Sequence, residues 1–509
     1  MRSSGSCAAC TYPSACPARV GSRGHRIGPD GGRSHTLEKR IMDHLEKLTT
    51  LSIGEEIPPP IRQMLEQLAG LPYVDSVLAL PDVHWKAEME VPSSIAINTH
   101  GVIVPEFTSM DVNDGMGIVK TGLREDEMPL ERLEAFFASV NANAAAHRSD
   151  TNRYSLSAAE LRRTLDEGAG ALLSRYQLEK TVLKGMEDGG RAPTNDLEAG
   201  TLTEVVPLQL LLTPFTRTEM GLNFGGNHFL EVQVVDELVD REVAARWGFE
   251  RGQVVVMYHL GPGPFSATLL NHYSRRTKLP RARVPLFFLS KLLFHYLQRM
   301  GKGAASRKWA LHFRQNGWTA LPAESEEGRV VRQALAMAIN FGYAYRLATV
   351  RAIADGLHDV VSPKLPWELF TDVSHNGVEE RRSSDGTSFV ARHNACRLEA
   401  GRPTIVAGLH DVPSYVGIGS GGVDGRLSSY DHGAGQLIER HRKGGRLAEA
   451  AGHVTCFRMT RGRVAKTLSR QEFPVRSFEL LDRLMGCFES RRMMRPVVRL
   501  RPLGNLKND

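Results

Sequence analysis

The sequence Gly101-Val102-Ile103-Val104, followed shortly by Met110-Asp111-Val112-Asn113-Asp114-Gly115, decides the kind of fold that this chain adopts. A short apolar run rich in β-branched residues predicts a buried strand, and the two aspartates stand in the loop that it enters. An earlier run, Val74 to Leu80, predicts a strand that leads into Pro81-Asp82-Val83-His84 in the same way. Carboxylates and histidines at strand ends are therefore a recurring feature of this chain.

Outward from these strands, helical and strand patterns alternate along most of the sequence. Apolar residues at three- and four-residue spacing predict helices, and short continuous apolar runs predict strands. The predicted helices are 36–48, 61–68, 130–140, 156–176 and 331–353, and the predicted strands are 74–80, 101–104, 229–235 and 254–260, with a loop at 187–204. Sequence repeats of fixed period are absent, so we predict one mixed α+β domain rather than a string of modules.

The composition excludes several classes of protein. Hydrophobic residues make up 41% of the 509 residues and charged residues 24%, which is typical of a globular chain. The sequence has no apolar run of the roughly 18 residues that a membrane-spanning helix needs, so we predict no membrane association. The net charge of +7 is compatible with a polyanionic partner. Six cysteines, three of them crowded at the start and three far apart, favour a reducing, cytoplasmic location.

The first 34 residues differ from the rest. They are rich in Ser, Gly and Arg and lack hydrophobic periodicity, so we predict a disordered N-terminal extension at 1–34 and a catalytic domain at 35–509. The extension has no apolar stretch of the kind found in secretory signals. Met42 is an alternative start. Cys7, Cys10 and Cys16 lack a fourth ligand at useful spacing, so a zinc site is not expected there.

The residues able to carry chemistry are acids and histidines, many of them beside glycine. A single loop histidine or turn aspartate is more often structural than functional. Several of these residues, however, stand next to glycines, which let backbone N–H groups approach a metal or phosphate closely. The set comprises Asp82, His84, Asp111, Asp114, His228, His259, His375 and His432.

At this point the chain resembles the RtcB-type RNA ligases, over about Leu80 to Lys507. The matching motifs, in order, are Leu80-Pro81-Asp82-Val83-His84-Trp85, Asp111-Val112-Asn113-Asp114-Gly115, Gly226-Asn227-His228-Phe229-Leu230-Glu231, His259-Leu260-Gly261, His375-Asn376, Ser414-Tyr415-Val416 with Gly419, His432-Gly433-Ala434-Gly435 and Pro502-Leu503-Gly504-Asn505-Leu506-Lys507. The resemblance implies a single large domain with antiparallel-rich sheets and flanking helices.

The resemblance also implies an activity. Ligases of this family join RNA with a 2′,3′-cyclic phosphate or 3′-phosphate to RNA with a 5′-hydroxyl, using GTP and manganese, through a guanylylated histidine. Carried over to this chain, it implies metal ligands at Asp111, Asp114, His228, His259 and His375 for one or two manganese ions. It implies a nucleophile at His432 and nucleotide contacts at Asn227, Glu231, His432, Gly433, Gly435 and Lys507. A role in RNA repair or tRNA splicing, with an archease-like activator, follows from the same resemblance.

The implied chemistry is consistent with the residue types. A neutral imidazole attacks an α-phosphate only when cations neutralise the triphosphate, so metal and nucleophile need one shared pocket. A mixed set of histidines and carboxylates suits manganese. Asp114 stands where the family has a metal-bridging cysteine, and a carboxylate favours harder ions than a thiolate does.

Other departures remove cations that would hold phosphate. The family's His-Ser-Gly-Ser-Arg-Gly is His259-Leu260-Gly261-Pro262-Gly263-Pro264 here, and the arginine after its His-Gly-Ala-Gly motif is Gln436. The family's Pro-Gly-Ser-Met and His-Arg-Lys-Gly correspond to Ala407-Gly408-Leu409-His410 and His393-Asn394-Ala395-Cys396. An arginine binds phosphate through two parallel hydrogen bonds that glutamine does not reproduce.

These losses leave alternatives open. Nearby cations are candidates for compensation, although such runs are more often solvated surface: Arg275, Arg276, Lys278, Arg397, Arg440, Arg442 and Lys443. The first hypothesis is an RNA ligase. The second is a metal-dependent RNA-end phosphohydrolase or nucleotidyl transferase that has lost ligation, and the third is a non-catalytic RNA-end-binding protein. The complete set of aspartates and histidines argues against the third.

Overall fold

Strand β5 (Gly115–Arg124) follows directly on the aspartate loop and is buried along most of its length. The structure is a computed structural model that describes residues 46–86, 89–143, 151–193, 202–218, 220–275, 284–298, 304–313, 317–420, 427–461, 466–477 and 479–508. Inter-residue contacts group His44–Asp509 into one compact unit. The predicted boundary at residues 34 and 35, Met42 and the N-terminal cysteines lie outside the described residues.

The larger sheet contains β5 near one of its edges. Its strand order is β13-β14-β18-β6-β7-β5-β9, and β16 and β17 extend it beside β18. The strands are β6 (Phe229–Leu238), β7 (Gln253–Leu260), β9 (Trp367–Ser374), β13 (Pro403–Val406), β14 (Ser414–Gly419), β16 (Ala448–Arg461), β17 (Lys466–Ser477) and β18 (Met494–Asn508). Neighbours are antiparallel except β16 and β18.

A second sheet has the order β1-β2-β3-β11-β10. Its strands are β1 (Leu48–Thr50), β2 (Val74–His84), β3 (Ser93–His100), β10 (Asn376–Ser383) and β11 (Gly386–His393). Two small pairs complete the described sheets: β12 (Ala395–Arg397) with β15 (Ser429–Asp431), and β4 (Val102–Ile103) with β8 (Leu321–Pro322). Strand β9 of the large sheet ends at Ser374 and β10 of the second sheet begins at Asn376, so His375 lies where the two sheets meet.

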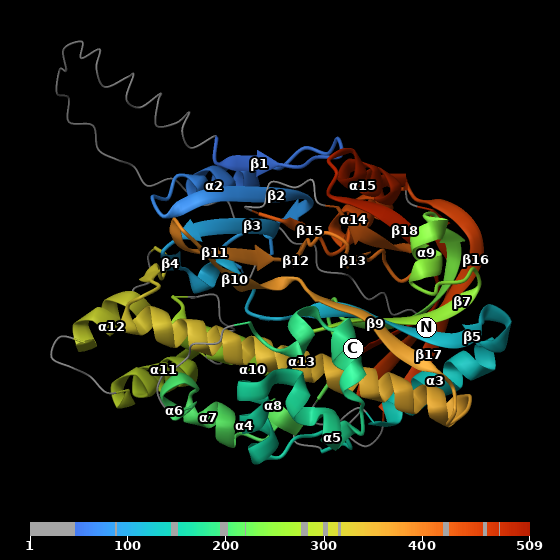
Figure 1. Ribbon diagram of the computed structural model, residues 1–509, viewed down its shortest axis with the longest axis horizontal. Coiled ribbons are helices and arrows are strands. Elements are labelled where there is room, and N and C mark those ends of the chain that lie inside the picture. Colours follow the sequence, from blue (N-terminus) through green and yellow to red (C-terminus); the bar gives the residue numbers. More distant parts are fainter. Residues whose placement is uncertain are drawn as a thin grey trace, which may run out of the picture. The chain divides into compact units, whose positions relative to one another are not determined.

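Helices cover both sheets (Figure 1). The longest, α13 (Glu326–Val360), runs across the lower half of this view, with α4, α5, α6, α7 and α11 below it, while α2, α14 and α15 lie in the upper half. The bounds are α2 (Pro59–Ala69), α3 (Leu130–Asn143), α4 (Ala158–Glu167), α5 (Leu173–Tyr176), α6 (Leu202–Val205), α7 (Leu208–Leu212), α8 (Phe215–Thr218), α9 (Arg241–Arg246), α10 (Pro264–Tyr273), α11 (Val284–Leu297), α12 (Ala304–His312), α14 (Gly435–Lys443) and α15 (Glu479–Ser490).

The apolar runs of the central strands are explained by burial on both faces. In β7, Val254, Val256 and Tyr258 join the core that packs against α13, whereas Val255 and Met257 join the core on the opposite face. A strand buried on both sides has no need of alternating polar residues. The prediction of one α+β domain with antiparallel-rich sheets and flanking helices is confirmed.

Three local predictions need correction. Leu48 begins strand β1 rather than ending a helix, and the rest of that predicted helix, up to residue 45, lies outside the described residues. The predicted helix 156–176 is broken by a 3-10 turn at Gly168–Leu172, where Gly168 has a φ of 70°. The strand predicted at 101–104 is reduced to the two residues of β4. Within the described residues, no helix is long and apolar enough to cross a membrane.

Candidate active site

The loop Asp111–Asp114 is held in place by helix α13. Asn113 adopts a left-handed φ of 62°, and its side-chain amide donates to the carbonyl oxygen of Ile339 at 2.6 Å. Arg346 donates to the carbonyl oxygen of Asn113 from the same helix. Gly342 lets the two segments approach, because a Cβ there would lie 2.7 Å from that of Asn113. These contacts fix the two aspartates at the start of β5.

The histidines reach the same place through the register of the large sheet. Met116 of β5 pairs with His259 of β7, and His259 also pairs with Phe229, the residue after His228. On the other side of β5, Gly115 pairs with Ser374, the residue before His375. Because antiparallel neighbours place the start of one strand beside the end of the next, these residues meet at one end of β6, β7, β5 and β9.

Asp111, Asp114, His228, His259 and His375 thus form what we call the Asp/His cluster, with Asp114 at its centre. The Nε2 atoms of His375, His228 and His259 lie 3.2, 3.4 and 3.6 Å from the carboxylate oxygens of Asp114. His228 Nε2 also lies 3.7 Å from Asp111 Oδ2. The structure therefore brings together all five residues that the sequence suggested as ligands.

The cluster has the properties of a cation site. Asp114 Oδ1, His259 Nε2 and both ring nitrogens of His375 are buried and form no hydrogen bond among the described residues. Buried polar atoms normally have partners, and neutral imidazoles with carboxylates are ligands for manganese and similar ions. One ligand atom from each of Asp114, His228 and His259 lies within 4.8 Å of the others, and the same holds for His259, His375 and His432. The donor set fits one or two divalent ions.

The charges of the cluster compensate one another. Burial would lower the pKa of His228, but Asp114 and Asp111 raise it to about 9. Burial and the charge of Asp114 raise the pKa of Asp111 to about 7, and burial lowers the pKa of His259 to about 4. Metal ligands bind in their deprotonated forms, so a cation at this place displaces protons from His228 and Asp111.

His432 lies against the cluster at the end of β15. Its ring stacks on that of His375, with centroids 4.4 Å apart and planes 25° apart. Its Nδ1 is 3.1 Å from the carbonyl oxygen of Asn394, so Nδ1 carries the proton and Nε2 keeps its lone pair. Burial, together with the charges of His375 and His259, holds the pKa of His432 well below its ordinary value. The ring is therefore a neutral imidazole with one free nitrogen.

The glycines after His432 have different surroundings. A Cβ at Gly433 would lie 2.8 Å from the carbonyl oxygen of Ala407, so a tight backbone contact requires this glycine. A Cβ at Gly435 would meet only a leucine methyl at 3.9 Å.

At the start of α14, the carboxylate of Asp82 accepts from the N–H groups of Gln436 and Leu437 at 3.3 and 2.8 Å. Asp82 thus caps this helix, and Asp431 Oδ2 in turn accepts from the Asp82 N–H at 3.0 Å.

The other predicted nucleotide contacts are Asn227, Glu231 and Lys507. Asn227 is exposed, and Lys507 Nζ lies 3.4 Å from the carbonyl oxygen of Gly226 beside it. Glu231 is buried and accepts from Asn505 Nδ2 at 2.8 Å, and burial raises its pKa to about 7. Asn227 and Lys507 therefore share one edge of the site, and Glu231 lies under it as a hydrogen-bonding group of the sheet.

The altered loop after His259 has a role that sequence reasoning missed. Gly263 N–H donates to Asp111 Oδ1 at 2.9 Å. A Cβ on Gly261 would lie 2.7 Å from Asp111 Oδ2, so only glycine leaves room for this carboxylate. The loop thus supports a ligand of the cluster through its backbone. In the sequence, the signal for this role was the run of glycines and prolines from Gly261 to Pro264. Glycine has no side chain, so it is used where the backbone must approach another group closely.

The cations proposed as replacements for the lost arginines point elsewhere. Arg397 pairs with Glu187, Asp188 and Glu399, and Arg442 forms two short contacts with Asp411, at 2.6 and 2.8 Å. Arg440 faces Glu55, and Lys443 is exposed. Arg275 donates from Nε to the carbonyl oxygen of Leu311, while Arg276 and Lys278 lie outside the described residues. Arg397, Arg440 and Arg442 thus all face carboxylates, so the candidate compensation by these three arginines finds no support in their contacts.

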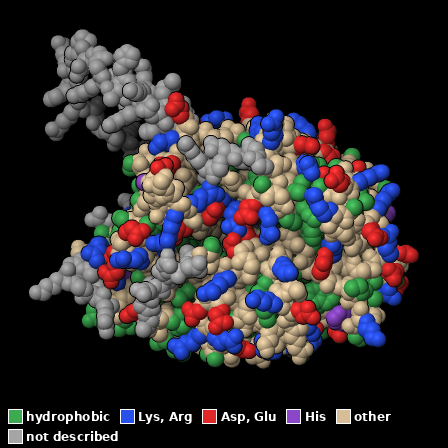
Figure 2. Space-filling view, viewed as in Figure 1, with side chains coloured by type: hydrophobic (Ala, Val, Ile, Leu, Met, Phe, Trp, Pro, Cys, Tyr) green, Lys and Arg blue, Asp and Glu red, His purple; other side chains and the backbone are tan. Residues whose placement is uncertain are grey.

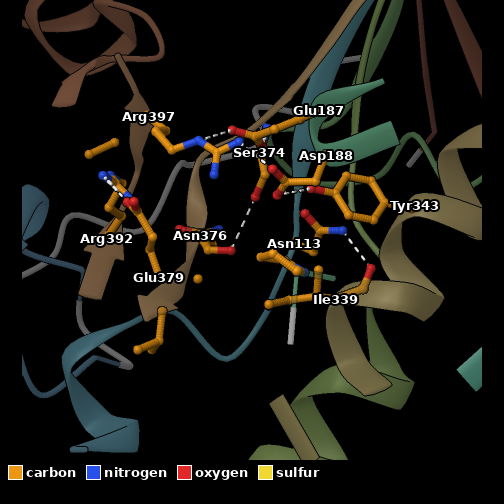
Figure 3. A pocket seen from close by; sticks show the side chains of 14 residues that line it. Asn113, Glu187, Asp188, Ile339, Tyr343, Ser374, Asn376, Glu379, Arg392 and Arg397 are labelled. Atoms are coloured by element: carbon orange, nitrogen blue, oxygen red, sulfur yellow. Dashed lines mark hydrogen bonds and ion pairs between the residues drawn. The ribbon is translucent and has the colours of Figure 1, made fainter. Parts of the chain in front are cut away.

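A small pocket of about 60 Å³ lies beside the His375 turn (Figure 3). Glu187 accepts from the N–H of Ser374 at 3.0 Å and also pairs with Arg397, as the close-up shows. Asn376 receives a hydrogen bond from Asn113 N–H at its carbonyl oxygen. These residues hold the turn that carries His375. Glu187 stands at the start of the predicted loop 187–204, and nothing in the pattern of that loop indicates a partner.

Known proteins are similar to this chain over the region that contains these residues. The family described as tRNA-splicing ligase RtcB matches residues 64–508. A tRNA-splicing ligase RtcB of Thermococcus kodakarensis is 27% identical over 74% of this chain and 76% of its own length. One of Archaeoglobus fulgidus is 25% identical over 88% and 91%. An RNA-splicing ligase RtcB of Mycobacterium bovis is 26% identical over 86% of this chain and 99% of its own length.

Proposed function

Because the chain belongs to the RtcB family of RNA ligases, we propose that it is a GTP- and manganese-dependent enzyme acting on broken RNA. It joins a 2′,3′-cyclic phosphate or 3′-phosphate end to a 5′-hydroxyl end, in RNA repair or tRNA splicing. The observation that carries this proposal is the stacking of a neutral His432 on the Asp/His cluster. A nucleophile and a cation site in contact are what attack on a triphosphate requires.

The proposed first step is attack of His432 Nε2 on the α-phosphorus of GTP. A nitrogen–phosphorus bond forms, the bond to the β-phosphate oxygen breaks, and pyrophosphate leaves. Asn394 stabilises the reacting ring, because its carbonyl oxygen accepts from Nδ1–H as positive charge develops. Manganese bound to the cluster supplies positive charge that neutralises the phosphate oxygens.

The residues around His432 orient the reaction. The stack on His375 and the hydrogen bond to Asn394 fix the ring plane, and a ring nitrogen of His432 lies within 4.8 Å of ring nitrogens of His259 and His375. Asn227 and Lys507 lie at the edge where the guanosine would be held. Transfer of the guanylyl group from His432 to an RNA 3′-phosphate then activates that phosphate. The 5′-hydroxyl of the second RNA attacks the activated phosphate, and GMP leaves.

Covalent labelling tests this proposal. Incubation with manganese and α-labelled GTP should label the protein, and the label should be acid-labile and alkali-stable, as expected for a phosphoramidate. His432→Ala and His432→Asn should remain unlabelled. His453→Asn, at an exposed histidine in β16, is the matched control and should label like the wild type. Equal labelling of His432→Ala and wild type would refute the assignment of the nucleophile.

One observation favours a second function, a metal-dependent phosphohydrolase or nucleotidyl transferase. Arg397 and Arg442, two candidate replacements for the lost arginines, are each paired with carboxylates. RNA with a 2′,3′-cyclic phosphate and a 5′-hydroxyl separates the two. Joined RNA with release of GMP supports ligation, and opening of the cyclic phosphate without joining supports the second function.

Figure 2 shows Lys/Arg and Asp/Glu intermixed on the face viewed, so RNA binding there does not rest on one basic surface.

A further inference from the structure

Asn376 begins strand β10 directly after the cluster histidine His375, and it is almost fully buried. Its backbone joins it to the neighbouring segments of the site. Its carbonyl oxygen accepts from the N–H of Asn113 at 2.8 Å and from the hydroxyl of Ser374 at 3.3 Å (Figure 3). Both contacts use a main-chain atom of Asn376, so they do not depend on its side chain.

The side chain of Asn376 contacts the turn between β11 and β12. Its Oδ1 atom accepts from the N–H of Asn394 at 2.9 Å. The next N–H of that turn, the N–H of Ala395, donates to the carbonyl oxygen of His375 at 2.9 Å. Two consecutive N–H groups of one turn are therefore bound to two consecutive residues of another, and the second turn carries a cluster histidine.

Asn394 has a backbone conformation that needs support. Its φ of 52° lies in the left-handed region, which is uncommon for residues other than glycine, although asparagine adopts it more often than most. Such a conformation persists where the surrounding structure determines it. The hydrogen bond to Asn376 is one such contact, and its loss would leave the buried N–H of Asn394 without an acceptor.

The carbonyl oxygen of Asn394 lies in the peptide between these two N–H groups and faces His432. It is 3.1 Å from the Nδ1 atom of His432, whose ring stacks on that of His375. A carbonyl oxygen can only accept a hydrogen bond, so this contact requires the proton on Nδ1 and leaves Nε2 with its lone pair. The position of this oxygen therefore selects the tautomer of His432.

We propose that Asn376 is a positioning residue, which holds the turn at Asn394 and so keeps His432 in the tautomer with a free Nε2. The inference rests on the proposed function, in which Nε2 attacks the α-phosphorus of GTP. In the other tautomer Nε2 carries the proton and has no lone pair for phosphorus. The backbone of Asn376 also holds Asn113 in the aspartate loop, so one residue orients both the Asp/His cluster and the nucleophile.

The first measurement does not depend on GTP. The tautomer of His432 is determined by NMR from its ring-nitrogen chemical shifts, in the full-length chain at neutral pH without added metal ion. The signal is identified by its absence in His432→Asn. The wild type should carry the proton on Nδ1, whereas Asn376→Ala should show a substantial share of the Nε2–H tautomer. Asn376→Asp keeps the acceptor oxygen and should resemble the wild type.

The second measurement is the single-turnover rate of labelling by α-labelled GTP at saturating manganese. Asn376→Ala should be labelled about 10- to 100-fold more slowly, the range for loss of an outer hydrogen bond in a metal site. The GTP concentration that gives half the maximal rate and the manganese affinity should stay close to those of the wild type, because the backbone contact with Asn113 remains.

Two control variants accompany these measurements. Asn394→Gly keeps the carbonyl oxygen, and glycine adopts a positive φ readily, so its tautomer and labelling rate should match those of the wild type. Ser383→Ala, at the exposed far end of β10, should also match the wild type. If Asn376→Ala does not fold, Asn376→Ser replaces it with a smaller polar side chain.

Three results would overturn the proposal. They are a wild type with the proton on Nε2, a folded Asn376→Ala whose tautomer or labelling rate equals that of a labelled wild type, and a loss of manganese affinity as large as the loss of rate. If the tautomer depends on Asn376 but GTP does not label the wild type, the role of Asn376 stands and the proposed function fails.

Discussion

The N–H of His375 donates to the carbonyl oxygen of Asp114 at 3.0 Å, and the Nε2 of the same histidine lies 3.2 Å from the Asp114 carboxylate. The two residues are thus joined by backbone and side chain at once. Asp114 immediately precedes β5 and His375 immediately follows β9, so the pairing of these two strands sets the geometry of the cluster. A change in sheet register would separate the pair.

The first prediction is that Asp114 sets the metal preference of the cluster. Asp114→Cys should bind zinc more tightly relative to manganese, because a soft thiolate replaces a hard carboxylate at the centre of the site. Metal analysis of the purified variant gives the zinc-to-manganese ratio. Asp385→Cys, at an exposed aspartate, controls for the added thiol. An equal ratio in Asp114→Cys and wild type would argue against Asp114 as a ligand.

Gly261 leaves the space that the carboxylate of Asp111 occupies. Gly261→Ala should raise the dissociation constant for manganese by about 10- to 100-fold, as is typical when support of a ligand is lost. The new methyl group would lie 2.7 Å from Asp111 Oδ2. Gly377→Ala has open space around its Cβ and should leave manganese affinity unchanged. Isothermal titration of both variants decides, and equal affinities would contradict the prediction.

Arg346 joins α13 to the large sheet beneath the cluster. It is fully buried and forms two 2.7 Å hydrogen bonds with Asp372, which also accepts from Tyr258 at 2.6 Å. Arg346→Met should lower the free energy of unfolding by about 3–5 kcal/mol, because Asp372 is left as an unpaired buried charge. Urea denaturation measures the loss.

Two further variants test that explanation. Arg351→Met removes a partly exposed pair with Asp355 on the same helix and should cost about 0–1 kcal/mol. Arg346→Met combined with Asp372→Asn should recover part of the lost stability, because no lone charge remains. A loss below about 1 kcal/mol for Arg346→Met would show that the ion pair contributes little.

Three histidines buried among α10, α11 and α12 make stability depend on pH. His295 stacks on His312 with centroids 4.4 Å apart, and its Nε2 is 2.8 Å from the carbonyl oxygen of His272. Burial lowers the pKa of His272 to about 4 and that of His295 to about 3. The unfolded chain binds protons at these histidines near pH 6.5, whereas the folded chain does not.

Stability contributed by these groups is therefore complete above pH 6.5 and falls as the pH drops toward 4. The slope is about 1.4 kcal/mol per pH unit for each histidine. His295→Gln keeps a donor toward His272 and should reduce the slope by about one histidine's share between pH 6 and 4.5. Denaturation midpoints measured across this range, with metal removed from both proteins, provide the test. Identical slopes in His295→Gln and wild type would show that His295 is solvated in the folded protein and that burial does not lower its pKa.

The sequence predicted those parts of the fold whose patterns are strong and local. Strands β6 and β7 and helix α13 were predicted because long apolar runs and regular spacing are visible without tertiary contacts. The strand at Leu48 was missed because three residues, paired with Val77 and its neighbours, depend on a partner strand far along the chain.

The site was predictable where residue type alone indicates chemistry. Aspartates and histidines beside glycines pointed to the cluster, and the family motifs suggested His432 as the nucleophile that we propose. Arg346 and Glu187 were missed because a helix interior and a polar loop give no sign of which partner they meet.

Strand β18 gives the assembly of this protein a particular order. It lies between β14 and β6, and Asn505 pairs with Glu231 across 274 residues of chain. During synthesis, β6 and β7 leave the ribosome long before the strand that joins them to β13 and β14. The large sheet therefore closes late, and pairing over such a distance is slow. Lys507 is on that strand, so a partly made chain lacks the edge at which we propose that GTP binds.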